Sequence, residues 1–115
     1  MSYQDHIRAE ARLIMLKALA AQTNESLTST ILRLELEQFA IKRERGWVHT
    51  EMRWLEEAGA IALKATGTVL IGTLTETGAR HLNREIIIEG ILRPSRLGED
   101  VVSAGLSLAK SRLEP

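Results

Sequence analysis

The stretch Gly46–Ile61, GWVHTEMRWLEEAGAI, predicts a helix, a glycine stop and the start of a β-strand. The helix is expected from about Trp47 to Ala58, because its apolar residues step by four, three and three positions along one face. Gly59 follows as the left-handed residue that ends many helices. Gly46 is expected outside the helix, because a glycine in a helix interior costs about 1 kcal/mol relative to alanine. The residues of the expected core face are Val48, Met52, Leu55 and Ala58.

Two further helices are expected before this stretch. From Tyr3 to Ala21 the apolar residues recur at three- and four-residue steps, which is typical of an amphipathic helix. Thr28 is suited to cap a second helix from Ser29 to about Ala40, with Leu27 and Leu32 at the spacing of a hydrophobic staple. The expected buried residues of this second helix are Ile31, Leu32, Leu36 and Phe39.

After the glycine stop, residues 60–75, AIALKATGTVLIGTLT, alternate and are rich in β-branched residues. They predict a β-hairpin of about seven residues per arm, centred on Thr66-Gly67. Thr75 is then suited to cap a fourth helix from Glu76 to about Ile88. The expected order is three helices, a hairpin and a helix.

The remaining residues, 91–115, are expected to form a linker and a C-terminal arm beyond a domain of residues 1–90. Pro94 interrupts any helix and restricts the residue before it, which favours a linker. Apolar residues then recur with helical spacing, so the arm is expected either to pack on another subunit or to fray. These residues are Val101, Val102, Leu106, Leu108, Ala109 and Leu113.

The composition limits the class of protein. With 115 residues and 44% hydrophobic content, the chain is large enough for one modest core. It has no cysteine and no continuous apolar stretch long enough for a signal peptide or a membrane span, which favours the cytoplasm. The net charge is zero, which argues against binding to nucleic acid through bulk charge alone.

The charges are, however, unevenly distributed along the chain. Residues 42–54 contain four basic residues against two acidic ones, a net charge of +2. The flanking stretches, residues 23–41 and 55–92, each have a net charge of −2. Positive charge is therefore concentrated at the start of the third helix.

The element order and several short motifs resemble those of winged helix-turn-helix proteins. The stretch Thr50–Ile61, TEMRWLEEAGAI, is similar to the end of the recognition helix in MarR-type and ArsR-type regulators, and Leu74–Leu82, LTETGARHL, to the exit from their wing. The resemblance covers about residues 7–89. It implies an α+β, mostly α, fold with three helices, a β-hairpin wing and C-terminal helices. The chain lacks the cysteine metal sites of many ArsR-type proteins and the long flanking dimer helices of MarR-type proteins.

A narrower resemblance is to a family of small uncharacterised proteins of Mu-like phages and prophages. It rests on WLEEAG at Trp54–Gly59, on Leu74, Thr75 and Gly78, and on GILRPS at Gly90–Ser95. The tail after Ser95 is longer in this chain. This resemblance implies a phage or prophage origin.

In a helix-turn-helix protein the third helix lies in the major groove of duplex DNA. The face opposite the expected core therefore gives candidate base contacts, and basic residues before it give candidate phosphate contacts. Residues of the expected wing tip would reach the adjacent backbone. These DNA-binding candidates are Lys42, Arg43, Arg45, Trp47, His49, Thr50, Arg53, Lys64, Thr66 and Thr68.

Other interpretations apply to some of these residues and to the function. Trp47 is suited equally to a half-buried packing role, and Arg45 and Arg53 are suited equally to a solvated surface. Trp54 is expected to pack against the wing or the C-terminal segment. A single helix covers few base pairs, so DNA binding would call for a homodimer, formed through the first helix or the arm. The resemblance thus implies a duplex DNA-binding protein, a transcriptional regulator of a phage or prophage that reads the major groove with its third helix. The alternative function is that of a phage accessory protein that uses the same fold to bind a phage or host protein.

The sequence offers little for catalysis. His81 and Glu85 are spaced for one helix face, but no third metal ligand is in view, so a salt bridge is expected. No phosphate-binding glycine motif or nucleophile motif is present. The chain is therefore expected to be neither an enzyme nor a protein with a metal or cofactor.

Overall fold

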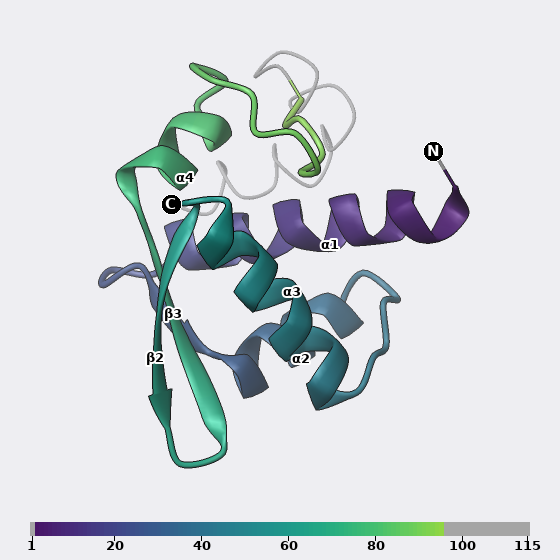
Figure 1. Cartoon of the computed structure of the whole chain (residues 1–115), viewed down its shortest axis with the longest axis vertical. Coiled ribbons are helices and arrows are strands. Elements are labelled where there is room, and N and C mark those ends of the chain that lie inside the picture. Colours follow the sequence, from purple (N-terminus) through teal and green to yellow (C-terminus); the bar gives the residue numbers. More distant parts are fainter. Residues whose placement is uncertain (1, 96–115) are drawn as a thin grey trace, which may run out of the picture.

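The computed structural model describes residues 2–95 of the chain. Over these residues the chain forms a compact, mostly helical α+β domain with four helices and a three-stranded antiparallel sheet (Figure 1). In this part of the chain no helix combines the length and apolar character needed to cross a bilayer. The elements are α1 (Tyr3–Ala20), β1 (Ser26–Thr28), α2 (Ser29–Glu37), α3 (Arg45–Glu57), β2 (Ile61–Thr66), β3 (Val69–Leu74) and α4 (Glu76–Leu82).

Helix α1 confirms the expected first helix and forms the centre of the core. It begins with a capping box, in which the Ser2 hydroxyl accepts from the Asp5 N–H at 3.0 Å and the Asp5 carboxylate accepts from the Ser2 N–H. Its other end shares the core with α2, α3 and the sheet. The buried residues of α1 are Ala9, Ala11, Leu13, Ile14, Met15, Leu16, Ala18 and Leu19.

Helix α2 begins as expected but ends three residues early. The Thr28 side chain accepts from the Ile31 N–H at 3.2 Å, which confirms the cap. Leu32 and Leu36 are fully buried, as expected. The expected burial of Ile31 and Phe39 is wrong, because their exposed fractions are 43% and 55%.

The exposure of these two side chains has a geometric cause. Ile31 projects from a different side of α2 than Leu32 and Leu36, which together with Ser29 are the buried residues of this helix. Past Glu37 the backbone tightens into turns, and Ala40 takes a positive φ of 64°. Phe39 therefore no longer follows the helical period that predicted its burial.

The sheet contains a strand that the sequence did not predict. Strand β1 pairs with β3 from Ser26↔Thr73 to Thr28↔Ile71, so β3 is central and the strand order is β1-β3-β2. The side-chain hydroxyls of Ser26 and Thr73 lie 2.6 Å apart across this pair. A strand of three residues is too short to show an alternating pattern.

The β2–β3 hairpin is present, with six residues in each arm instead of about seven. Its register runs from Ile61↔Leu74 to Thr66↔Val69. The two turn residues are Gly67 and Thr68, one position later than expected, and Gly67 has the positive φ of 59° that such turns favour. The hairpin extends past the helices at the lower left of Figure 1.

Helix α4 is capped by Thr75, as expected, through a 3.1 Å hydrogen bond from the Gly78 N–H to its hydroxyl. It ends at Leu82 instead of about Ile88, and Arg84 has a positive φ of 63°. The expected salt bridge of His81 with Glu85 is wrong, because Glu85 lies beyond the helix and pairs with Arg80 at 3.4 Å.

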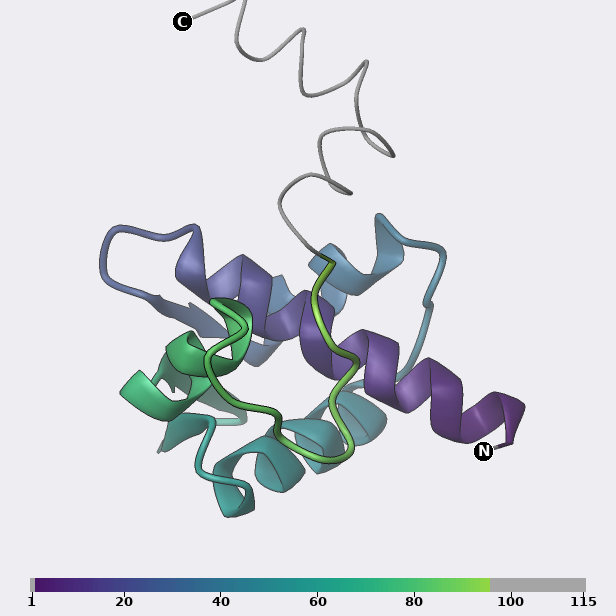
Figure 2. The same cartoon turned by 90° about the horizontal axis from the view of Figure 1, so that it is seen from above.

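His81 is instead fully buried and joins α4 to the segment that follows it. Its Nδ1 accepts from the Ile88 N–H at 3.2 Å, so its Nε2 carries the proton and donates to the Leu92 carbonyl at 3.0 Å. The Leu92 N–H in turn donates to the Ala9 carbonyl in α1. Figure 2 shows this segment crossing over α1.

Ile91 is buried in the core, so the packed unit continues past the boundary expected at residue 90. Residues 96–115, which include the expected helical arm, lie outside the described residues.

Candidate nucleic-acid interface

Helix α3 carries five of the ten residues that the sequence predicts to contact DNA. It begins at Arg45, so the expectation that Gly46 precedes the helix is wrong. The Glu44 carbonyl accepts from the N–H groups of Trp47 and Val48, at 3.1 and 3.2 Å, and this closes the first turn around Gly46. Glu44 itself makes no side-chain capping hydrogen bond.

Three of the four residues expected on the core face of α3, Val48, Met52 and Leu55, are fully buried. The fourth, Ala58, is only half-buried, because the helix ends at Glu57 and Ala58 is its C-cap. Gly59, directly after the C-cap, has a φ of 83°. There the Gly59 N–H donates to the Glu56 carbonyl and the Ala60 N–H donates to the Leu55 carbonyl, both at 2.9 Å.

The exposed residues of α3 are Arg45, Gly46, Thr50, Arg53, Glu56 and Glu57. Of these, Gly46, Thr50, Arg53 and Glu57 lie opposite the core face, while Arg45 and Glu56 are exposed near the two ends of the helix.

The exposed charges of α3 run against the helix dipole. The first turn has no acidic residue and the last turn has no basic one. Arg45 lies at the positive, N-terminal end of the dipole, while Glu56 and Glu57 lie at the negative end. Each such placement is unfavourable by about 0.3–1 kcal/mol when the helix end is solvated.

Glu51, the remaining acidic residue of α3, does not contribute to this face. Its side chain is buried and contacts two arginines of α1, with Oε1 2.7 Å from Arg12 Nε and Oε2 3.5 Å from Arg8 Nε. Glu51 is one of the two acidic residues in the net charge of +2 of residues 42–54, so its burial leaves Glu44 as the exposed acidic residue of that stretch. The spacing of Glu51, three from Val48 and four from Leu55, is the signal that places it near the core face.

His49 is half-buried at the edge of the exposed face and points toward the sheet. Its Nε2 lies 3.0 Å from the hydroxyl oxygen of Ser29, which is buried and also accepts from the Leu70 N–H at 3.1 Å. Burial lowers the pKa of His49, and the positive charges of Arg45 and Arg53 lower it further. Both effects favour the neutral imidazole, which contacts α2 and, through Ser29, β3.

The two tryptophans of α3 are both half-buried. Trp47 packs against the core, and the Arg43 guanidinium lies 5.2 Å from its ring centroid. Trp54 packs against Gly90, where an added Cβ would lie 2.5 Å from the indole ring, which confirms the expected contact with the C-terminal segment. Trp47 thus has the packing role that the sequence left open.

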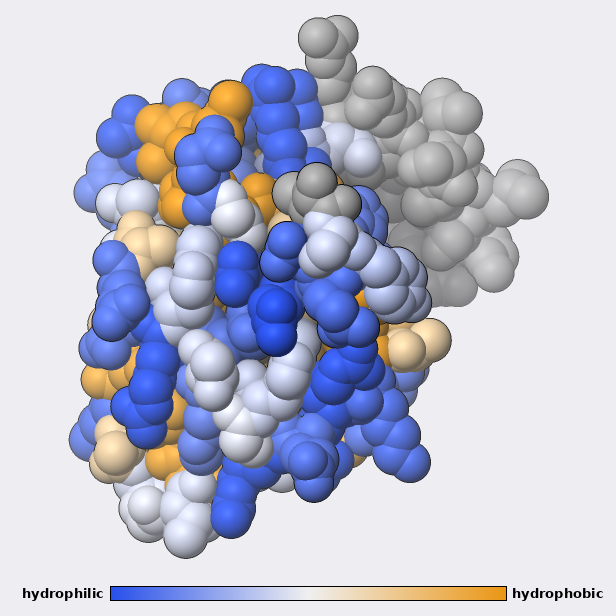
Figure 3. Space-filling model, turned by 45° about the vertical axis from the view of Figure 1, so that its right-hand side comes forward, coloured by the Kyte–Doolittle hydropathy of each residue, from blue (hydrophilic) through white to orange (hydrophobic). Residues whose placement is uncertain are grey.

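The remaining candidates are at the two ends of the exposed face. Lys42 is exposed and Arg43 half-exposed just before α3, and Lys64, Thr66 and Thr68 are exposed at the tip of the hairpin. Figure 1 shows the hairpin turn and the start of α3 toward the same, lower end of the molecule. In Figure 3, hydrophilic side chains cover most of the centre of the displayed face, and hydrophobic ones gather toward its upper and left margins.

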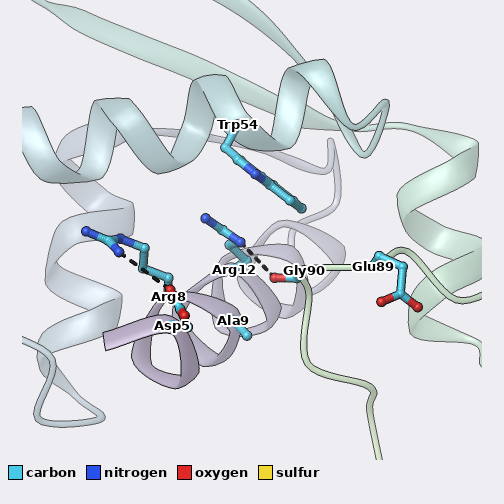
Figure 4. Close-up of a pocket in the computed structure, with 7 residues that line it drawn as sticks. All are labelled: Asp5, Arg8, Ala9, Arg12, Trp54, Glu89 and Gly90. Atoms are coloured by element: carbon cyan, nitrogen blue, oxygen red, sulfur yellow. Dashed lines mark hydrogen bonds and ion pairs between the residues drawn. The ribbon is translucent and has the colours of Figure 1, made fainter. Parts of the chain in front are cut away.

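A hollow of about 490 Å³ lies between α1, α3 and the turn at Gly90 (Figure 4). The Arg12 guanidinium is 3.8 Å from the Trp54 ring centroid and donates to the Gly90 carbonyl at 2.8 Å and to Glu51. Arg8 contacts Glu51 and, at 4.0 Å, Asp5. The arginines of the hollow are thus engaged in joining α1 to α3 and to the C-terminal segment.

Among residues 2–95, no group of three or more histidine, aspartate or glutamate residues is arranged to hold a metal ion. No protein-family model, curated protein sequence or solved structure matches this chain.

Proposed function

We propose that this domain is a winged helix-turn-helix that binds duplex DNA, with α3 in the major groove and the β2–β3 hairpin as the wing. The element order α1-β1-α2-α3-β2-β3 and the strand order β1-β3-β2 support this proposal. α2 and α3 pack on one another, as the two helices of a helix-turn-helix do.

The observation that carries the proposal is that two exposed arginines of α3, Arg45 and Arg53, take part in none of the ion pairs formed within residues 2–95. The exposed acidic residues of the helix, Glu56 and Glu57, lie in its last turn, and Glu51 is buried against Arg8 and Arg12. Arg45 is unfavourable for the isolated helix because of the dipole. An anionic partner bound near the N-terminal end of α3 would interact favourably with both arginines and with the helix dipole.

The proposed contacts follow from the positions of the residues. Arg53 and Arg45 are suited to bidentate contacts with guanine, and Thr50 to a thymine methyl group. Lys42 and Arg43 would contact phosphates at the start of α3, and Lys64, Thr66 and Thr68 would do so from the wing. His49 would act indirectly, by fixing α3 against α2, and Trp47 by packing.

The proposed assembly is a cytoplasmic homodimer that regulates transcription, without a cofactor or an enzymatic activity. A dimer is favoured because a domain of zero net charge that places one helix in the groove gains little affinity. The resemblance to proteins of Mu-like phages and prophages supports a phage or prophage origin.

A second candidate function, binding to a phage or host protein, is favoured by a different observation. Ile31, Leu34 and Phe39 are 43%, 45% and 55% exposed, all in or directly after α2. Ile31 and Leu34 are three positions apart and therefore neighbours on the surface of α2, and exposed apolar patches are typical of protein interaction sites.

DNA binding can be tested by fluorescence anisotropy with a labelled pool of random duplexes, at about 50 mM and about 200 mM salt. We expect affinity to fall steeply with salt. The double variant Arg45→Ala/Arg53→Ala is expected to lose at least about tenfold in affinity, or ~1.4 kcal/mol.

The matched control is Lys17→Ala/Arg93→Ala, which removes two exposed positive charges elsewhere on the domain. It should bind nearly as the unmodified protein does. No binding at low salt, or equal losses in both double variants, would contradict the proposal for α3.

A further inference from the structure

Gly46 differs from the other glycines of residues 2–95, each of which has an internal reason to lack a side chain. Three of them have a positive φ, and two are crowded by neighbouring atoms. The first group is Gly59, Gly67 and Gly90, and the second is Gly72, against Met52, and Gly78, against the Ala60 carbonyl. Gly46 has no positive φ, and an added Cβ would meet nothing within 4 Å.

The fold therefore does not require glycine at position 46. Glycine is also one of the least favourable residues within a helix, so alanine would suit α3 better. A remaining physical reason for glycine is the close approach of another molecule to the backbone.

The position of Gly46 on α3 agrees with such an approach. Gly46, Thr50, Arg53 and Glu57 follow one another at steps of four, three and four residues, so they form one stripe along the helix. This stripe lies opposite the buried Val48, Met52 and Leu55. A partner molecule that binds to the exposed side of α3 would thus contact this stripe first. Gly46 is the N-terminal residue of the stripe.

The hydrogen bonding next to Gly46 indicates which side chains near it could donate hydrogen bonds to a partner molecule and which could accept them. The Thr50 hydroxyl donates to the Gly46 carbonyl at 3.0 Å, so its proton is already in use. Thr50 then offers its methyl group and an acceptor oxygen, the hydrogen-bond donors of the stripe come from Arg53, and Arg45 adds donors beside Gly46 in the first turn. Gly46 lies between those two arginines in sequence, and it is the residue of the stripe that has no side chain.

We infer that Gly46 is the point at which the wall of the DNA major groove touches the α3 backbone, and that its missing side chain sets how deeply α3 enters the groove. This inference rests on the proposed DNA binding. It makes Gly46 a positioning residue, because it acts by allowing Arg45 and Arg53 to reach the bases.

The test is a size series at this position, Gly46→Ala and Gly46→Leu, measured for both thermal stability and DNA affinity. Both substitutions favour the helix, so we expect Tm to rise, by up to ~4 °C for a domain of this size. Affinity for the duplex pool should fall in the order of side-chain size, reaching about tenfold for Gly46→Leu. If Gly46 had only a structural role, its replacement would change thermal stability and DNA affinity in the same direction.

Ala20→Leu is the control for added bulk, because Ala20 is an exposed helical residue outside α3. It should leave DNA affinity unchanged. If the unmodified protein binds DNA and Gly46→Leu binds equally well, the inference fails while the proposed function stands. If the unmodified protein does not bind DNA, both fail. Should Gly46→Leu not fold, the affinity of Gly46→Ala decides.

Discussion

The imidazole of His49 in α3 lies 3.0 Å from the buried hydroxyl of Ser29 in α2, and that hydroxyl also accepts from the Leu70 N–H in β3. One side-chain oxygen thus joins the two helices to the hairpin. The angle at which α3 would face a partner depends on this contact. Its strength depends on the protonation state of His49.

His49 should make stability depend on pH. Its pKa is lowered in the folded state, because burial and the charges of Arg45 and Arg53 disfavour the protonated ring. The unfolded state then binds the proton more readily, so the contribution is fully present above the unfolded pKa of about 6.5 and is lost as pH falls toward the folded value.

We expect the difference in unfolding free energy between the unmodified protein and His49→Gln to shrink from about pH 7.5 to about pH 5.5, on either side of the unfolded histidine pKa. Urea denaturation of both proteins at the two pH values measures it. Because both proteins contain the same other titratable groups, the difference between their unfolding free energies isolates the contribution of His49. A difference that stays constant over this range would rule out His49 as the source.

Glu51 should be far more important for stability than the other glutamates of α3. Glu51→Ala would leave the largely buried Arg12 without its carboxylate, and breaking such a pair costs ~3–5 kcal/mol. Glu57→Ala is the control, because Glu57 is exposed at the end of the same helix, and removing its charge from the negative end of the dipole should stabilise the fold by no more than ~1 kcal/mol. Chemical denaturation compares the two, and equal effects would show that the Arg12–Glu51 pair is not structural.

Arg45→Glu should change stability and DNA binding in opposite directions. A negative charge at the start of α3 is favourable for the helix dipole by ~0.3–1 kcal/mol, so the unfolding free energy should rise. Affinity for duplex DNA should fall, since an anion would face the phosphates. Thermal unfolding and anisotropy on the same preparations measure both. A fall in stability would mean that Arg45 makes a contact that favours the folded state.

The exposed apolar side chains of α2 distinguish the two candidate functions. Ile31→Lys/Leu34→Lys should alter stability by no more than ~0.5 kcal/mol per site, because both side chains are already exposed. If the domain acts by binding duplex DNA, this variant should retain affinity in the anisotropy assay. Loss of DNA binding in this folded variant would place α2 within the interface and contradict the arrangement proposed for α3.

The local features of this fold were predictable from the sequence, because they depend on residues close together in the chain. The period of α1, the core face of α3, the caps at Thr28 and Thr75 and the left-handed Gly59 were all visible in this way. Each depends on spacing, or on the chemistry of a single side chain with its own backbone.

The contents of the candidate interface depended more on tertiary structure. The sequence placed Lys42, Arg45, Thr50 and Arg53 on or beside an outer face of the third helix, and they are exposed there. It also placed His49 on that face, but Ser29, which is distant in sequence, holds the imidazole against α2. Spacing along one helix cannot show what a neighbouring helix offers.

The sequence by itself thus determined the order of the helices and the hairpin and most of the apolar faces of α1 and α3. Only the tertiary structure decided which polar and apolar residues are enclosed: Glu51 and His81 became buried, while Ile31 and Phe39 became exposed. Burial depends on partners distant in sequence, such as Arg12 for Glu51 and Leu92 for His81. The three-residue strand β1 likewise exists because β3, more than forty positions away, supplies its hydrogen bonds.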